Sequence, residues 1–96
     1  MSDPSLLILA SLAEGEKHGY AMIEDIHRFA AVRLGPGTLY GAITRLEERR
    51  WIAPVGSNDD RRHPYRITAA GKRHLEGQLA QLDMVVRTGL RRLREA

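Results

Sequence analysis

Four polar side chains lie close together after a glycine-proline turn. Thr38, Tyr40, Thr44 and Arg45 supply hydroxyl groups and one guanidinium group along a segment with helical spacing. Hydroxyls at the start of a helix add to the free backbone N–H groups that attract phosphate, and an arginine one turn later can pair with guanine in a major groove. Gly41 between them allows a close backbone approach. By itself this pattern favours an ordinary amphipathic helix, but together with the wing and the heptad stripe described below it favours contact with DNA.

Two further basic clusters are candidates for the same chemistry. Arg61 and Arg62 follow a dense turn segment at 56–60 and can enter a minor groove or hold phosphates. Asp59 and Asp60, beside them, either pair with these arginines or form the turn itself. Lys17 and His18 precede the second helix, where they can touch phosphate or belong to a solvated loop.

Catalytic and metal chemistry find no support in the residue pattern. The chain has no cysteine, and its four histidines (His18, His27, His63 and His74) lack the spacing of a metal site. No serine lies in a nucleophile context, and no carboxylate pair is placed for acid–base work. We therefore expect neither an enzyme nor a bound metal or cofactor, and His27 is interpreted as a helix-packing residue.

Length and charge narrow the class of protein. With 96 residues, 43% of them hydrophobic, the chain is long enough for one folded core. Residues 1–60 carry six Lys/Arg and nine Asp/Glu, a net charge of −3, whereas residues 61–96 carry nine and three, a net charge of +6. The basic second part indicates a polyanionic partner or, alternatively, a solvated helix face. No signal peptide or membrane-spanning run is apparent, so a cytoplasmic protein with no membrane partner is expected.

Three helices are predicted in the first half. The first begins at Asp3-Pro4, is apolar on most sides and ends near Glu14-Gly15. The second begins near His18-Gly19, with a packed side formed by Tyr20, Ile23, Ile26, His27 and Ala30. The third begins at Pro36 and carries a buried stripe of Leu39, Ile43 and Leu46. The tight glycine turn between the second and third helices is typical of a helix-turn-helix.

A hairpin and a long helix are predicted in the second half. Residues 51–55 and 63–67 form two short strands, with Tyr65 and Ile67 on one face and Pro64 favouring an edge. Thr68 caps a helix over 69–95, about 40 Å long at about 1.5 Å per residue. A heptad stripe runs along it, weakened at Gly89, where Leu90 leans in. The stripe consists of Leu75, Leu79, Leu82, Val86, Leu90 and Leu93.

These elements predict a mainly α, α+β winged helix-turn-helix fold. A three-helix head and a two-stranded wing occupy residues 1–68 and bind DNA. A dimerisation helix occupies residues 69–96, because so long an apolar stripe needs a symmetric partner.

Three separated motifs keep a fixed order between residues 5 and 75. They are His18-Gly19-Tyr20, then PGTLYGAI at 36–43 followed by RLE at 45–47, then RHPYRITAAG at 62–71. Together they resemble the short subfamily of PadR regulators. The resemblance implies a homodimeric winged-helix repressor of a pseudo-palindromic operator, released by a small-molecule effector or another signal.

Two features depart from the pattern that the resemblance implies. The family usually has glycine at the position of Arg50, so either Arg50 adopts the left-handed conformation or the helix ends differently. Family members that bind flat aromatic drugs line a pore with aromatic residues of the last helix. Residues 69–96 contain no Phe, Tyr or Trp, so such a pocket is not expected, and Trp51 is interpreted as a core residue.

Two other functions compete with a DNA-binding repressor. The same scaffold can hold a partner protein as an interaction module without sequence-specific DNA binding. It can also serve as a small-molecule sensor that binds DNA weakly. The sequence does not identify the operator, the regulated genes or the effector, and it does not separate repression from activation.

Overall fold

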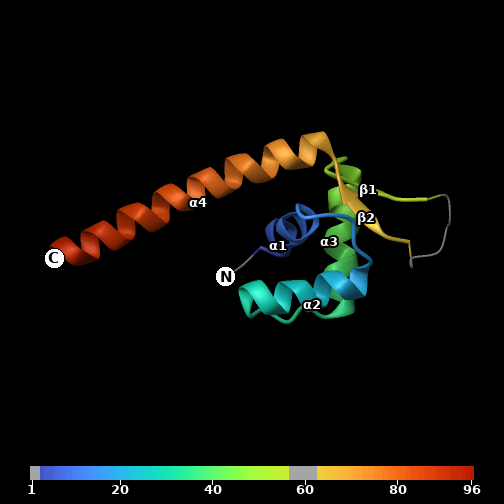
Figure 1. Ribbon diagram of the computed structural model, residues 1–96, viewed down its shortest axis with the longest axis horizontal. Helices are drawn as coiled ribbons and strands as arrows, with labels where there is room; N and C mark the ends of the chain where they lie inside the picture. The colour runs from blue at the N-terminus through green and yellow to red at the C-terminus, as the bar shows by residue number, and fades with distance from the viewer. Residues whose placement is uncertain (1–2, 57–62) are drawn as a thin grey trace.

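The computed structural model describes residues 3–56 and 63–96, so Arg61 and Arg62 lie outside the described residues. Its elements run in the order α1 Pro4–Leu12, α2 Gly19–Ala30, α3 Pro36–Glu48, β1 Ile52–Pro54, β2 Tyr65–Ile67 and α4 Ala69–Glu95. Helices α1 to α3 and the hairpin form a head, from which α4 extends as a long arm (Figure 1). The whole measures 55 × 26 × 20 Å. The predicted winged helix-turn-helix architecture is confirmed.

Helix α1 is the centre of the head. Asp3 caps it through a 2.9 Å hydrogen bond from the Ser5 N–H to its Oδ1, as predicted. The helix ends at Leu12 instead of near Glu14-Gly15. The chain turns there, with the Gly15 N–H bonded to the Leu12 carbonyl at 3.1 Å, and Lys17 then forms a bridge with Tyr65 of β2.

The packed side of α2 is partly as predicted, because Ile26 is buried and Ile23 and Ala30 pack against the core. Met22 and Ile26 are fully buried, whereas His27 is exposed and Tyr20 is 74% exposed. The predicted and observed sides overlap at Ile26 and differ by less than one residue of helical rotation, which is about 100°. The interpretation of His27 as a helix-packing residue was therefore wrong.

The end of α3 resolves the question raised by Arg50. This residue adopts the left-handed conformation, with φ of 61°. Its N–H bonds the Glu47 carbonyl at 2.9 Å, and the Trp51 N–H bonds the Leu46 carbonyl at 3.0 Å. The last carbonyls of α3 are thereby satisfied as in a glycine-capped helix, at the cost of placing a side chain in a crowded conformation.

The hairpin is short and antiparallel. Ile52 pairs with Ile67, Ala53 with Arg66 and Pro54 with Tyr65. Tyr65 and Ile67 are both buried while Arg66 between them is exposed, so the predicted alternation is confirmed. Lys17 adds one further antiparallel bridge on the other side of Tyr65, which the sequence did not indicate.

The start of α4 is fixed firmly to the head. Thr68 Oγ1 accepts the Gly71 N–H at 3.0 Å, confirming the predicted cap, and donates to the Arg50 carbonyl at 2.7 Å. Gly71 packs so closely on the Trp51 carbonyl that a Cβ there would collide with it. The His74 ring stacks on Trp51, which is half-buried against the core, with centroids 3.6 Å apart. These contacts set the direction in which α4 leaves the head.

Candidate nucleic-acid interface

Helix α3 separates its apolar and polar residues cleanly. Pro36 occupies the first turn after Gly35, which supplies no side-chain cap, so the leading N–H groups keep no side-chain partner within the described residues. A stripe of Leu39, Ala42, Ile43 and Leu46 is buried against the head. The opposite face is turned to solvent and carries Thr38, Gly37, Thr44, Arg45 and Glu48. The polar candidates of α3 are therefore on the outer surface of the head.

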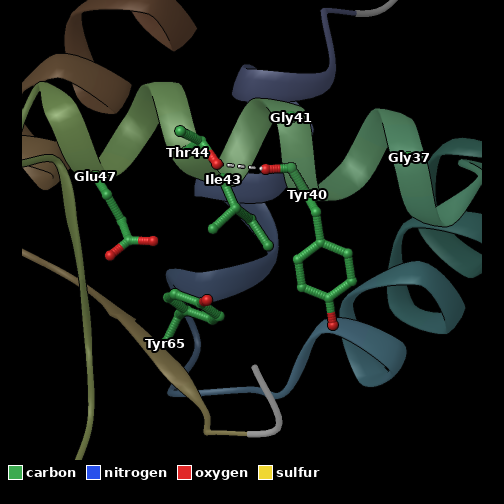
Figure 2. A pocket seen from close by; sticks show the side chains of 7 residues that line it. All are labelled: Gly37, Tyr40, Gly41, Ile43, Thr44, Glu47 and Tyr65. Atoms are coloured by element: carbon green, nitrogen blue, oxygen red, sulfur yellow. Dashed lines mark hydrogen bonds between the residues drawn. The ribbon is translucent and has the colours of Figure 1, made fainter. Parts of the chain in front are cut away.

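A groove of about 480 Å³ lies at the edge of this outer face, between α3 and β2. Figure 2 shows Tyr40 and Glu47 pointing from α3 toward the same side, with Tyr65 of β2 opposite them. Gly37, Gly41, Ile43 and Thr44 complete the lining. The groove thus brings together Tyr40, Gly41 and Thr44 of the predicted set. Thr38 and Arg45 lie on the same helix but do not line the groove.

The hydroxyl of Thr44 already makes one hydrogen bond within the protein. It donates a 2.9 Å hydrogen bond to the carbonyl of Tyr40, one turn earlier. With its single proton used, the oxygen keeps acceptor capacity and the side chain also presents a methyl group. Thr44 is suited to accepting from a base amino group or to packing on a thymine methyl.

Arg45 lies over Gly41 on the outer face of α3. Its Nη1 atom is 3.7 Å from the position that a Cβ on Gly41 would take. The side chain is exposed, and among residues 3–56 and 63–96 no carboxylate forms an ion pair with it. The guanidinium group is therefore available for a ligand that approaches the outer face of α3.

Four residues that line the groove were not among the predicted site residues, and two of them, Glu47 and Tyr65, carry polar groups. Glu47 shares a helical side with Tyr40 and Thr44, and this spacing of 40, 44 and 47 was the signal that could have identified it. Tyr65 comes from a strand far along the chain, so only the folded arrangement reveals it. Glu47 gives the groove an acceptor that suits a cytosine amino group and repels a phosphate.

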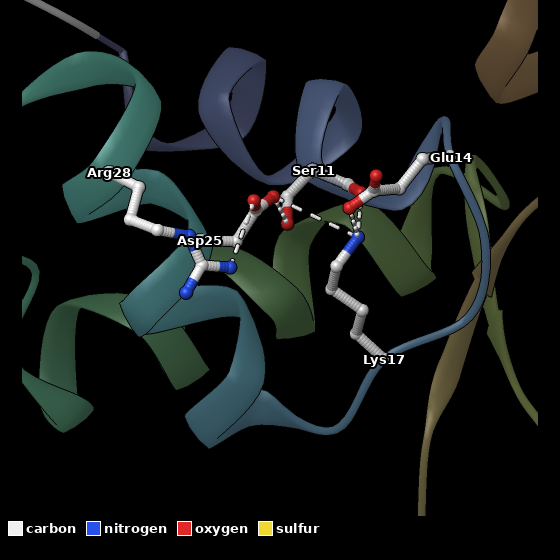
Figure 3. A network of polar contacts seen from close by, with 5 residues as sticks. All are labelled: Ser11, Glu14, Lys17, Asp25 and Arg28. Carbon is white, nitrogen blue, oxygen red and sulfur yellow. Dashed lines mark hydrogen bonds and ion pairs between the residues drawn. The ribbon is translucent and has the colours of Figure 1, made fainter.

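Lys17 and His18 lie at the start of α2 in different environments. His18 is exposed and is the N-cap residue of the helix, without a side-chain cap hydrogen bond. Gly19 follows it against the Tyr40 ring, where a Cβ would lie 3.0 Å from Cζ. The ammonium group of Lys17 instead points into the head, where oxygens of Ser11, Glu14 and Asp25 surround it (Figure 3).

The predicted stripe on α4 divides into two parts. Leu75 is buried within the core of the head. The five other members, from 45% to 76% exposed, are Leu79, Leu82, Val86, Leu90 and Leu93. In the part of the chain that the structure describes, no helix is long and apolar enough to cross a membrane. The exposed part of the stripe is an apolar surface on an arm that the head does not cover.

The family model that describes transcriptional regulators of the PadR-like family matches residues 8–77. This span includes the three head helices, the hairpin and the start of α4. The chain belongs to the PadR-like family. The family is one of transcriptional regulators.

Solved structures of PadR-like proteins have the same fold. A PadR family transcription regulator from Clostridium difficile R20291 is 25% identical, with a TM-score of 0.78, covering 88% of this chain and 92% of that one. A PadR family regulator from Eggerthella lenta is 30% identical, with a TM-score of 0.74, covering 96% and 81%. These matches extend over α4, so the long helix is also shared.

A curated relative is considerably longer. An uncharacterised 37.1 kDa protein of transposon TN4556 from Streptomyces fradiae is 41% identical over 75 residues, which is 78% of this chain. The chain spans about a fifth of the length of that relative, since the match covers 21% of it. The PadR-like head is therefore also found within a larger protein.

Proposed function

We propose that the protein is a homodimeric repressor that places two α3 helices in successive major grooves of a pseudo-palindromic operator. The half-sites then lie about 34 Å apart, one turn of DNA. The observation that carries this proposal is the outer face of α3, where hydroxyls, the open surface at Gly41 and Arg45, which has no ion pair among the described residues, adjoin the groove beside the hairpin. A cytoplasmic location follows from such a role.

Each candidate residue has a distinct proposed contact. Thr38 and Tyr40 hold a phosphate near the N-terminus of α3, supported by His18 at the start of α2. Thr44 and Arg45 reach base edges, and Gly41 allows the helix to approach. Arg61 and Arg62 of the wing, which lie outside the described residues, bind in the minor groove or contact the adjacent phosphates.

The head and the arm of the molecule have separate proposed roles. Residues 1–68 bind DNA, and residues 69–96 pair two subunits through the exposed stripe from Leu79 to Leu93. Leu75 contributes indirectly, because its burial in the head fixes the root of the arm. A signal that tilts the paired helices moves the two heads out of register with the operator and ends promoter occupancy. A small-molecule effector of unidentified chemistry is one such signal.

The test is a gel-shift titration with promoter DNA from the neighbourhood of the protein's own gene. We expect a sequence-preferring complex whose affinity falls steeply with salt, because each neutralised phosphate releases about 0.9 counterion. A complex that shows neither preference nor salt dependence contradicts the proposal.

Arg45→Ala and Arg61→Ala are expected to separate DNA binding from a protein-interaction role. Arg45→Ala should lower operator affinity about tenfold, since a good arginine–base pair contributes about 1–3 kcal/mol. Arg61→Ala should also lower affinity, because it removes a positive charge that attracts the DNA backbone. Arg87→Ala on α4 is the matched control, because Arg87 is exposed and pairs only with Asp83 among the described residues. If both head variants bind operator as tightly as the control does, the interaction module becomes the better reading.

A further inference from the structure

A compact polar network joins α1, α2 and the loop between them (Figure 3). The buried Ser11 hydroxyl donates to Asp25 Oδ2 at 2.7 Å. Lys17 Nζ donates to the Ser11 carbonyl and lies 2.8 Å from Glu14 Oε2 and 3.8 Å from Asp25 Oδ2. Arg28 Nη2 approaches the other oxygen, Asp25 Oδ1, at 3.6 Å. Every polar group in this network therefore has a partner.

The two central charges are largely removed from water. The Lys17 side chain is 14% exposed and that of Asp25 is 16% exposed. Burying a charge costs free energy unless a partner compensates for it, and removing one partner leaves the other charge uncompensated. The Ser11 carbonyl lies at the end of α1, where helix carbonyls lack helical partners and attract cations. The network is thus a fixed contact and not a solvated surface pair.

The backbone of Lys17 connects this network to the wing. Its N–H donates to the Tyr65 carbonyl at 3.1 Å, and its carbonyl accepts the Tyr65 N–H at 2.9 Å. Tyr65 lines one side of the groove, and Tyr40, packed on Gly19, lines another. Lys17 is two residues before Gly19. Both sides of the groove are therefore tied to the segment that the Lys17 side chain anchors.

We infer that Lys17 and Asp25 are positioning residues for DNA recognition. By holding the segment between α1 and α2 in place, they set the distance between the base of the wing and α3. This role replaces a phosphate contact of Lys17, whose ammonium group is already surrounded by oxygens. The inference rests on the proposed function of the groove as a DNA interface.

The two candidate roles of Lys17, phosphate contact and positioning, predict opposite changes in DNA affinity for Asp25→Asn. Removing an acidic group from a DNA-binding head strengthens binding if only charge matters. If Asp25 positions the wing, the same substitution weakens binding because Ser11 and Lys17 lose their shared anion. Glu24→Gln is the matched control, since Glu24 is exposed on the same helix and the charge change is identical.

The experiment measures fluorescence anisotropy at several salt concentrations with a promoter duplex and a scrambled duplex of equal composition. We expect Lys17→Met and Asp25→Asn each to lower the ratio of promoter to scrambled affinity about five- to tenfold, as coupled contacts of this kind do. The affinity ratio of the double variant should be no lower than that of the more strongly affected single variant. The salt slope should stay unchanged for Lys17→Met, and Glu24→Gln should keep the ratio of promoter to scrambled affinity of the parent protein. Melting curves establish that every variant is folded at the assay temperature.

Hydrogen exchange of the free protein adds a measurement that needs no DNA. Both network variants should accelerate exchange of the Tyr65 amide, whereas Glu24→Gln should not. Unchanged Tyr65 exchange overturns the inference. So does a salt slope lowered by about 0.9 in Lys17→Met together with tighter binding by Asp25→Asn, since that pair of results makes Lys17 a phosphate contact. Failure of the parent protein to prefer the promoter is a separate result and refutes the proposed function itself.

Discussion

Replacing Leu82 by lysine is expected to convert the proposed dimer to a monomer and to lower operator affinity about 100-fold or more. Leu82 lies in the middle of the exposed stripe of α4 and is 45% exposed in the single chain. Central apolar residues of an interface commonly contribute about 2 kcal/mol or more, and the two-fold symmetry removes two copies at once. Loss of pairing leaves each head to bind a half-site alone.

The choice of lysine sharpens this test. A lysine adds positive charge, which strengthens nonspecific attraction to DNA. A loss of affinity in Leu82→Lys is therefore due to lost pairing and not to altered charge. Because Leu82 does not belong to the buried core of the head, the subunit is expected to remain folded, which circular dichroism checks.

Met84→Lys is the matched control for Leu82→Lys. Met84 is 68% exposed on the same helix, two residues away and thus about 200° around its axis. The control should stay dimeric and bind operator as the parent protein does. Light scattering at micromolar concentration measures the mass of both variants. A dimeric Leu82→Lys shows that α4 does not pair through this stripe.

The sequence predicted best those elements whose signals are local. Pro36, the stripe of α3 and the Thr68 cap each act within one or two turns of helix, and the structure confirms all three. Local signals were right only in part on α2, where they identified Ile26 but not Met22 and wrongly included Tyr20 and His27. Only the positions of α1 and α3 decide that Met22 and Ile26 are buried while Tyr20 faces solvent.

The site was predictable only in part, for the same physical reason. The residues on the outer face of α3 followed from helical spacing alone. The contribution of Tyr65, the inward direction of Lys17 and the burial of Leu75 all depend on contacts between segments far apart in the chain. A spacing pattern contains no information about such contacts, so the groove and its supporting network required the folded structure.

Gly41→Ala is expected to stabilise the free protein and weaken its binding to DNA. Glycine within a helix costs about 1 kcal/mol relative to alanine. An added Cβ at Gly41 would meet only Arg45 Nη1, at an ordinary 3.7 Å. The free energy of unfolding should therefore rise by about 1 kcal/mol, which raises the melting temperature by roughly 4–8 °C in a domain of this size.

The opposite effect is expected on the complex. In the proposed interface Gly41 faces DNA between Tyr40 and Thr44, so a methyl group there separates the surfaces or forces them to shift. Overpacking of about 1–3 kcal/mol corresponds to a loss of roughly 10- to 100-fold in operator affinity. Calorimetric melting and anisotropy titration measure the two effects on the same sample.

Gly77→Ala separates the two effects of Gly41→Ala. Gly77 lies in α4, is exposed, and has no atom within 4 Å of an added Cβ. It should give the same gain in stability with no change in DNA affinity. Equal affinity of Gly41→Ala and Gly77→Ala shows that DNA does not approach α3 at this turn. In that case the N-terminus of α3 and the surface at Gly41 both lie outside the contact. The helix then docks by its C-terminal half, and any effect of Arg45→Ala arises there.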